Sequence, residues 1–142
     1  GPTGPTGPAG TAASFGGFYT TDTQVVTNAS FPLTSTQDVL NMTLDTTTGV
    51  VTLENAGTYL VSYGVYATTG STDTDTVSIY LNGAEVAGTE RSLQDDTMVD
   101  ATAIITVDEA TSELNIQITS AGAVTFDDPN GVNGYLTIVQ IA

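Results

Sequence analysis

The stretch YLVSYGVYAT, residues 59–68, alternates between more apolar and more polar residues. The more apolar set occupies the odd-numbered positions: Tyr59, Val61, Tyr63, Val65 and Ala67. The more polar set occupies the even-numbered positions: Leu60, Ser62, Gly64, Tyr66 and Thr68. A period of two is the pattern of a pleated strand with one face turned to a core. The stretch therefore predicts a long β-strand.

The same alternation recurs in residues 76–81, 101–107 and 114–118, and residues 134–142 read as a final strand. Asn82-Gly83 directly follows one of these segments, and Asn-Gly is a strong signal for a two-residue hairpin turn. Shorter strands are expected near residues 15–19, 24–28, 38–45, 50–53 and 123–127. The chain has 28 threonines, and β-branched side chains favour strands. Many short strands between turn residues predict an all-β sandwich, barrel or jelly roll.

A different pattern opens the chain, where GPTGPTGPAG places glycine at every third position of residues 1–10. Only glycine fits at the axis of a collagen triple helix, and proline stiffens each of its three strands. We therefore predict that residues 1–14 are the end of a collagen-like stalk and that residues 15–142 form one head domain. Three or four triplets are too few to hold a triple helix, so the head is expected to join the three chains.

The final strand agrees with such a joining role. Leu136 and Ile138 fall on one face of this strand, whereas Val139 and Ile141 fall on the other. A strand that is apolar on both faces is typically buried on both. We predict a homotrimer whose interface includes Leu136, Ile138, Val139 and Ile141.

Charge and composition exclude several classes of function. The chain carries 16 acidic residues and one basic residue, Arg91, for a net charge of −15. This charge disfavours nucleic acid and anionic membranes as partners, and no apolar run reaches the 18 residues of a membrane span. Histidine and cysteine are absent, so the usual zinc ligands and the commonest general base are missing. We predict no enzymatic activity and no membrane insertion.

Aspartates cluster in three segments that read as loops, and together they raise the possibility of bound calcium, the one cofactor we consider. Calcium prefers six to eight oxygen ligands, which such loops can supply, although none of the segments has the EF-hand spacing. The simpler interpretation is that these residues form turns. Arg91 is expected to pair with a carboxylate, within the chain or across subunits. The candidate calcium ligands are Asp73, Asp75, Asp95, Asp96, Asp127 and Asp128.

Three stretches carry a resemblance to a known superfamily: TTTGVVTLENAGTYLVSYGVYA (46–67), VSIYLNGAEVAGT (77–89) and FDDPNGVNGYLTIVQIA (126–142). They resemble, in order, the glycine-rich entry to a long core strand, a strand ending in an Asn-Gly turn, and a last strand entered through Gly134 and Tyr135. These features are similar to those of the trimeric jelly-roll heads of the complement-first-component and tumour-necrosis-factor superfamily. The resemblance implies an antiparallel two-sheet jelly-roll sandwich that forms trimers.

With the Thr-rich collagen repeat, the chain most resembles bacterial collagen-like surface glycoproteins, such as the exosporium filament proteins of BclA type. The resemblance implies an extracellular location on a spore or cell surface, and glycans on Thr3 and Thr6. Two functions follow. The first is a structural head that sets chain register and forms the outer surface of a filament. The second is an adhesin or a phage-fibre tip that binds a host-surface protein or a carbohydrate, for which Tyr66 and Tyr80 are the aromatic residues to inspect.

Overall fold

The predicted strand at residues 59–68 is the 11-residue strand β6 (Gly57–Ala67) of a computed structural model that describes residues 14–142. Its five predicted inward side chains are at most 1% exposed, so the alternation is confirmed. Of the predicted stalk, residues 1–13 lie outside the described residues. The other strands of the described part are β1 (Phe15–Thr20), β2 (Gln24–Val26), β3 (Ser35–Leu40), β4 (Met42–Leu44), β5 (Val51–Leu53), β7 (Thr76–Leu81), β8 (Ala84–Glu85), β9 (Arg91–Ser92), β10 (Thr97–Val107), β11 (Ser112–Thr119), β12 (Val124–Phe126) and β13 (Gly134–Gln140).

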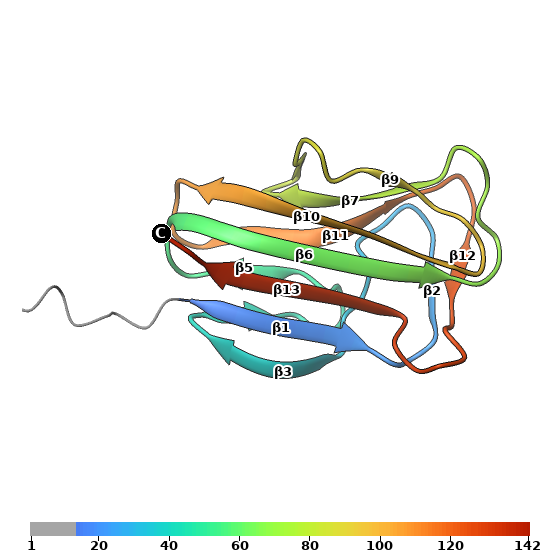
Figure 1. Ribbon diagram of the computed structural model, residues 1–142, viewed down its shortest axis with the longest axis horizontal. Helices are drawn as coiled ribbons and strands as arrows, with labels where there is room; N and C mark the ends of the chain where they lie inside the picture. The colour runs from blue at the N-terminus through green and yellow to red at the C-terminus, as the bar shows by residue number, and fades with distance from the viewer. Residues whose placement is uncertain (1–13) are drawn as a thin grey trace, which may run out of the picture.

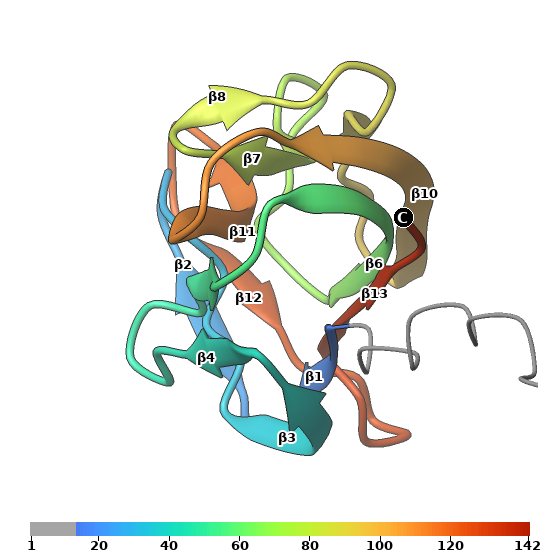
Figure 2. The same cartoon turned by 90° about the vertical axis from the view of Figure 1, so that its left-hand side faces the viewer.

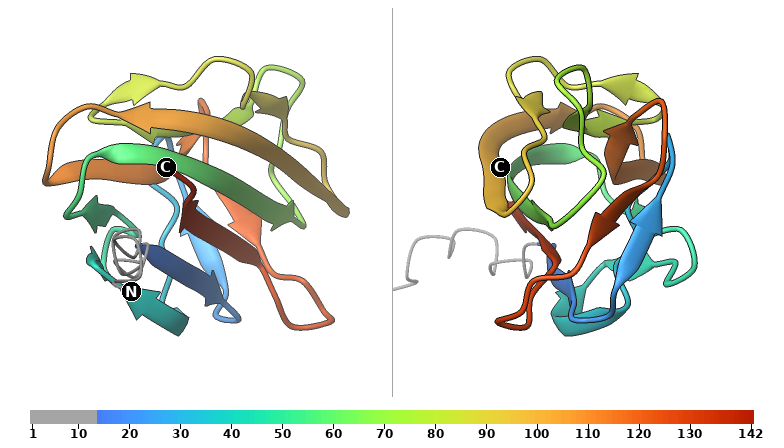
Figure 3. Two further views of the ribbon diagram at one scale, coloured as in Figure 1. Left: turned by 60° about the vertical axis from the view of Figure 1, so that its left-hand side comes forward. Right: turned by 90° about the vertical axis from the view of Figure 1, so that its right-hand side faces the viewer.

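The strands form two antiparallel sheets that pack face to face, with a short ribbon beside them (Figures 1 and 2). The five-stranded sheet has the order β10-β6-β13-β1-β3 and faces the viewer in Figure 1. The six-stranded sheet has the order β4-β5-β11-β7-β8, and β9 also pairs with β7. The ribbon joins β2 to β12, which lie side by side in Figure 3. This arrangement is the predicted jelly-roll sandwich. No helix in residues 14–142 is long and apolar enough to cross a membrane.

The core lies between the two sheets and closes at one side with aromatic residues. Most inward side chains of both sheets are apolar and buried, as two packed sheets require, and a few polar ones such as Thr20 and Ser112 are buried with them. Phe31 and Phe126 meet edge to face, with ring centroids 5.0 Å apart and an interplanar angle of 81°. The largest fully buried side chains are Tyr59, Tyr63, Phe18, Phe31, Phe126, Leu33, Leu53, Ile79, Leu114, Ile116, Ile118 and Leu136.

The predicted hairpin turn is also present. Leu81 pairs with Ala84, so Asn82 and Gly83 alone connect β7 to β8. Both residues have positive φ angles, 50° and 81°, which is the conformation that Asn-Gly favours in a two-residue turn.

The start of β1 and the C-terminus meet at one end of the sandwich (Figure 1). The backbone N–H of Gln140 donates to the oxygen of Ser14 at 2.8 Å, and the N–H of Ser14 donates to Oε1 of Gln140 at 3.2 Å. The amide of Asn55 donates to Oγ of Ser14 at 3.0 Å. Ser14, the last residue of the predicted stalk segment, is thus anchored to the last strand. We call this the stalk end of the sandwich.

Candidate assembly face of the five-stranded sheet

Five apolar side chains line up across the outward face of the five-stranded sheet, close to its stalk end. The register pairs Leu60 with both Ile104 and Val139, pairs Val139 with Phe15, and pairs Phe15 with Leu40. Paired residues lie on the same face of a sheet. The apolar row, as we name it, therefore runs across all five strands as Ile104, Leu60, Val139, Phe15 and Leu40.

Most of the apolar row faces solvent in the single chain. Ile104 is 68% exposed, Leu60 39% and Val139 38%, while Phe15 and Leu40 are half-buried. The row contains no charged residue, although the chain has 16 acidic ones. A contiguous exposed apolar strip of this kind is a candidate contact surface.

Moving away from the stalk end, the next outward rows become polar and then aromatic. Ser62 and Thr102 share a hydrogen bond of 2.9 Å in the polar row. In the following row the ring of Tyr135 lies on Gly64, where an added Cβ would come 2.5 Å from ring atom Cε1. Burial raises the pKa of the Tyr135 hydroxyl, and the nearby carboxylate of Asp100 raises it further. The outward face therefore changes along the strands from an apolar row to a polar row and then to an aromatic row.

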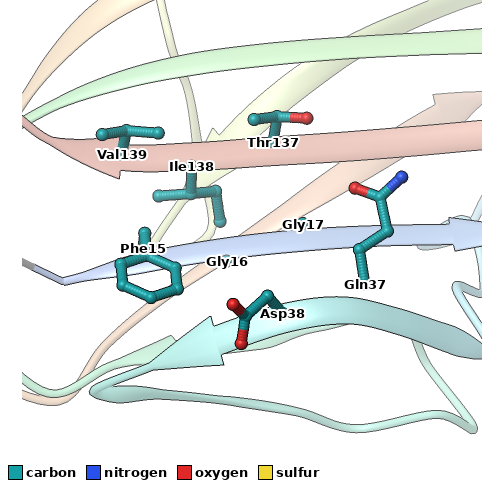
Figure 4. A pocket seen from close by; sticks show the side chains of 8 residues that line it. All are labelled: Phe15, Gly16, Gly17, Gln37, Asp38, Thr137, Ile138 and Val139. Carbon is teal, nitrogen blue, oxygen red and sulfur yellow. The ribbon is translucent and has the colours of Figure 1, made fainter.

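A hollow of about 350 Å³ opens on this face between the apolar and the polar row (Figure 4). Its floor is the β1 backbone at Gly16 and Gly17, and Gly17 leaves the outward face without a side chain, whereas a Cβ on Gly16 would point inward against Met42 and Phe18. A Cβ added to Gly17 would come 2.5 Å from Oε1 of Gln37, at the rim of the hollow. The hollow is lined by Phe15, Gly16, Gly17, Gln37, Asp38, Thr137, Ile138 and Val139.

The four predicted interface residues divide into an inward and an outward pair; three of them lie on β13, and Ile141 directly follows its last residue, Gln140. Leu136 and Ile138 point inward and are 0% exposed, so the core of their own chain takes up their side chains. Val139 and Ile141 are 38% and 51% exposed and remain available to a second chain. The separation of the two pairs follows the predicted alternation, and only the outward pair can contribute to an interface.

The six predicted calcium ligands do not come together. Among residues 14–142, no group of three or more acidic side chains is arranged to hold a metal ion. Asp95 accepts hydrogen bonds from the N–H and the hydroxyl of Ser71, at 3.1 and 2.6 Å. Asp75 and Asp128 accept the backbone N–H groups of Thr72 and Asn130, at 2.9 and 2.8 Å.

The other three candidate calcium ligands also belong to turns or exposed segments. Asp96 has a positive φ of 59°, which marks it as a turn residue, and Asp73 and Asp127 are exposed. The aspartates of these loops thus shape turns, and the geometry does not support the calcium hypothesis. Asp75 is nevertheless buried, at 1% exposure, and its Oδ1 atom has no hydrogen-bond partner.

Comparison with known proteins agrees with the two-sheet sandwich fold. A family model described as the BclA C-terminal domain matches residues 18–142. The chain belongs to this family. None of the curated proteins compared with the chain matches it.

Solved structures similar to this BclA C-terminal domain share its fold at low sequence identity. The Eiger TNF of S. frugiperda superposes with a TM-score of 0.68 at 18% identity, covering 92% of this chain and 94% of that one. Rabbit GITRL gives a TM-score of 0.59 at 14% identity, with 92% and 95% covered. Murine APRIL gives 0.56 at 14% identity, with 91% and 99% covered. The resemblance to tumour-necrosis-factor-like jelly rolls is confirmed at the level of the fold.

Arg91, the single basic residue of this BclA C-terminal domain, binds the backbone of the edge strand β10. The guanidinium of Arg91 donates to the backbone oxygens of Asp100, Gly88 and Glu90, at 3.0, 3.1 and 2.7 Å. These hydrogen bonds run to carbonyl groups, not to the carboxylate that we expected from the sequence. Arg91 thereby ties the loop before β9 to the outer edge of β10.

Sequence reasoning missed four members of the apolar row: Phe15, Leu40, Leu60 and Ile104. Leu60 and Ile104 occupy positions that the alternation assigns to the polar face, and each adjoins a core residue. An apolar pair such as Ile104-Ile105 or Tyr59-Leu60 was the available signal, because it puts one apolar side chain on each face. The alignment of these pairs across strands depends on the register, which a single sequence does not show.

Proposed function

We propose that this BclA C-terminal domain is the trimerisation head of a collagen-like filament, where it joins three chains and sets their register. The observation that carries the proposal is a coincidence of position. The G-X-Y triplets end at residue 12, two residues before Ser14, and the exposed apolar row lies at the same end of the sandwich as Ser14. A collagen helix needs three parallel chains, and an uncharged contact surface beside its entry would supply them.

The balance of forces favours contact at this row over other parts of the surface. Three copies at −15 each carry −45 in total, so repulsion opposes their approach. Burial of one exposed Val, Leu or Ile side chain contributes up to about 1.5–3 kcal/mol. Each copy offers three such side chains, Ile104, Leu60 and Val139, beside the half-buried Phe15 and Leu40. Salt screens the repulsion, and the Debye length falls to about 10 Å at 0.1 M. The trimer should therefore gain stability as salt rises.

Sedimentation of the full chain and of a variant without residues 1–12 tests the proposal. We expect both to be trimers at micromolar concentration, because the head alone provides the contacts. Val139→Asp should dissociate the trimer by placing a charge in the apolar row. The matched control is Thr43→Asp on β4, an exposed position of the other sheet, which should leave the trimer intact. A folded monomer in the absence of residues 1–12 would refute the role of the head.

The family and the collagen repeat also support a finer proposal about setting. We propose that the protein is extracellular, on a spore exosporium or a bacterial cell surface, and that its part there is structural and not catalytic. Thr3 and Thr6 are proposed as glycan attachment sites, since both occupy the third position of a stalk triplet. Mass spectrometry of the protein purified from its native surface tests this, and an unmodified N-terminal peptide would contradict it.

A further inference from the structure

We propose that Ile104 of one copy seats in the hollow over Gly16 and Gly17 of the next copy. This inference rests on the proposed trimeric head and names the contact that would close it. Ile104 is the most exposed large apolar side chain of the described residues, at 68%. The hollow is the place on the same face where side chains are missing.

Rotational symmetry explains why two different patches are needed. In a three-membered ring each contact is heterologous, so one patch of a copy meets a second, different patch of its neighbour. Ile104 lies on β10, one edge of the five-stranded sheet, while the hollow lies over β13, β1 and β3 towards the other edge. The two patches do not overlap. Each copy can therefore give its Ile104 to one neighbour and receive the Ile104 of the other.

The register places both patches at the same height along the strands. The hollow reaches into the apolar row through Phe15 and Val139, and Ile104 belongs to that row. Three stalk strands must converge where the chains enter β1, which favours a three-fold axis roughly parallel to the strands. Rotation about such an axis keeps every residue at its height. Ile104 of one copy then meets the row of the next copy where the hollow opens.

The chemistry of the hollow suits a branched apolar side chain. Phe15 and Val139 form apolar walls, and the floor carries no side chain of its own on this face. The amide of Gln37 reaches over Gly17, so this flexible side chain must turn aside where Ile104 approaches the floor. The one charged residue at its margin is Asp38, on the edge strand β3. Other occupants are less favoured, because the stalk delivers two further copies of the same chain to this face. A second copy is therefore the occupant to which we commit.

The absence of cysteine allows a direct test by crosslinking. The double variant Ile104→Cys/Thr137→Cys places one thiol on β10 and one at the rim of the hollow on β13. Within one chain these positions are separated by β6, so their Cα atoms lie about 10 Å apart at the usual strand spacing. A disulfide spans at most about 7 Å between Cα atoms. Any disulfide that forms must therefore link different copies.

We expect mild oxidation of the double variant to give a covalent trimer on a denaturing, non-reducing gel. Each single variant should give no covalent trimer, because one thiol per chain can link only two chains. The matched control Ile104→Cys/Thr43→Cys moves the second thiol to the other sheet and should also give no covalent trimer. Circular dichroism before oxidation shows whether each variant folds.

A second measurement needs no new thiol. Ile104→Ala should raise the concentration at which the trimer dissociates by at least about tenfold, a change equivalent to about 1.4 kcal/mol. Thr106→Ala, two residues further along the outward face of β10, should leave it unchanged. If the unsubstituted protein is a trimer, but the double cysteine variant forms no crosslink and Ile104→Ala does not change trimer dissociation, this inference is wrong. The proposed function would still stand. An unsubstituted monomer would overturn both.

Discussion

A comparison of Gly49 with Gly83 separates the energetic cost of a left-handed backbone conformation from the cost of steric crowding. Their φ angles are nearly equal, 79° and 81°, so alanine meets the same left-handed conformation at both sites. Their surroundings differ. A Cβ on Gly49 would lie 2.0 Å from the backbone oxygen of Phe31 and 3.0 Å from the backbone nitrogen of Leu33, whereas a Cβ on Gly83 would meet nothing within 4 Å.

The two substitutions should therefore destabilise the head to very different extents. The left-handed conformation costs a residue with a Cβ about 1–2 kcal/mol, and loss of unfolded-state entropy returns about 0.4–1 kcal/mol of that. Gly83→Ala should lower the free energy of unfolding by about 1 kcal/mol. Gly49→Ala adds an overpacking cost of about 1–3 kcal/mol or more. Phe31 cannot simply retreat, because it is fully buried and its N–H donates to the oxygen of Ile116 at 2.8 Å.

Denaturant unfolding followed by circular dichroism measures both variants. All samples must share one protomer concentration, because the stability of an oligomer depends on it. We expect Gly49→Ala to lose at least about 2 kcal/mol more than Gly83→Ala. Equal losses, within about 0.5 kcal/mol, would show that the segment at Phe31 yields freely and that the close approach does not constrain the fold.

Three further predictions concern the core, the hydroxyl of a buried tyrosine and the loop aspartates. Leu136→Ala should lower the free energy of unfolding by about 2–5 kcal/mol, whereas Val139→Ala should leave a folded head and weaken only the trimer seen in sedimentation. Burial raises the pKa of the Tyr63 hydroxyl far above its usual range, so the unfolded chain loses that proton first and stability should fall as pH rises above about 10. Tyr63→Phe should reduce this alkaline loss, and it should cost about 1 kcal/mol at neutral pH because the hydroxyl donates to the oxygen of Thr89 at 2.5 Å. The melting temperature should be equal in millimolar calcium and in chelator, and a rise with calcium would restore the metal-site hypothesis.

Local patterns were sufficient to predict most of the fold. The alternation of residues 59–68 indicated a core strand, and Asn82-Gly83 indicated its turn, because both signals depend only on near neighbours. The short strands β2, β5 and β12 were also expected within one or two residues. The predicted strand near 38–45 proved to be two strands, β3 and β4, which belong to different sheets. Asn41 stands between them with a positive φ of 58°, a change of direction that the composition of the segment did not reveal.

The assembly face was harder to predict because it is a property of register. Val139 and Ile141 could be assigned to an outward face from β13 alone. Leu60 and Ile104 could not, since their importance arises only when β6 is placed between β10 and β13. Arg91 was unpredictable for a related reason. Its partners are backbone oxygens, and no residue type in the sequence announces them.

The same alternation that builds the sandwich also separates folding from assembly. Along β13, Leu136 and Ile138 face the core of their own chain, while Val139 faces outward in the apolar row. A shift of one residue in the pairing of this strand would exchange the two sets. Leu136 and Ile138 would then face outward, and Val139 would face the core. The hydrogen bonds between Ser14 and Gln140 hold this register at the stalk end, where the chain leaves the collagen repeat. The contacts that would serve the proposed trimerisation head at its stalk end thus also secure the register of its own last strand.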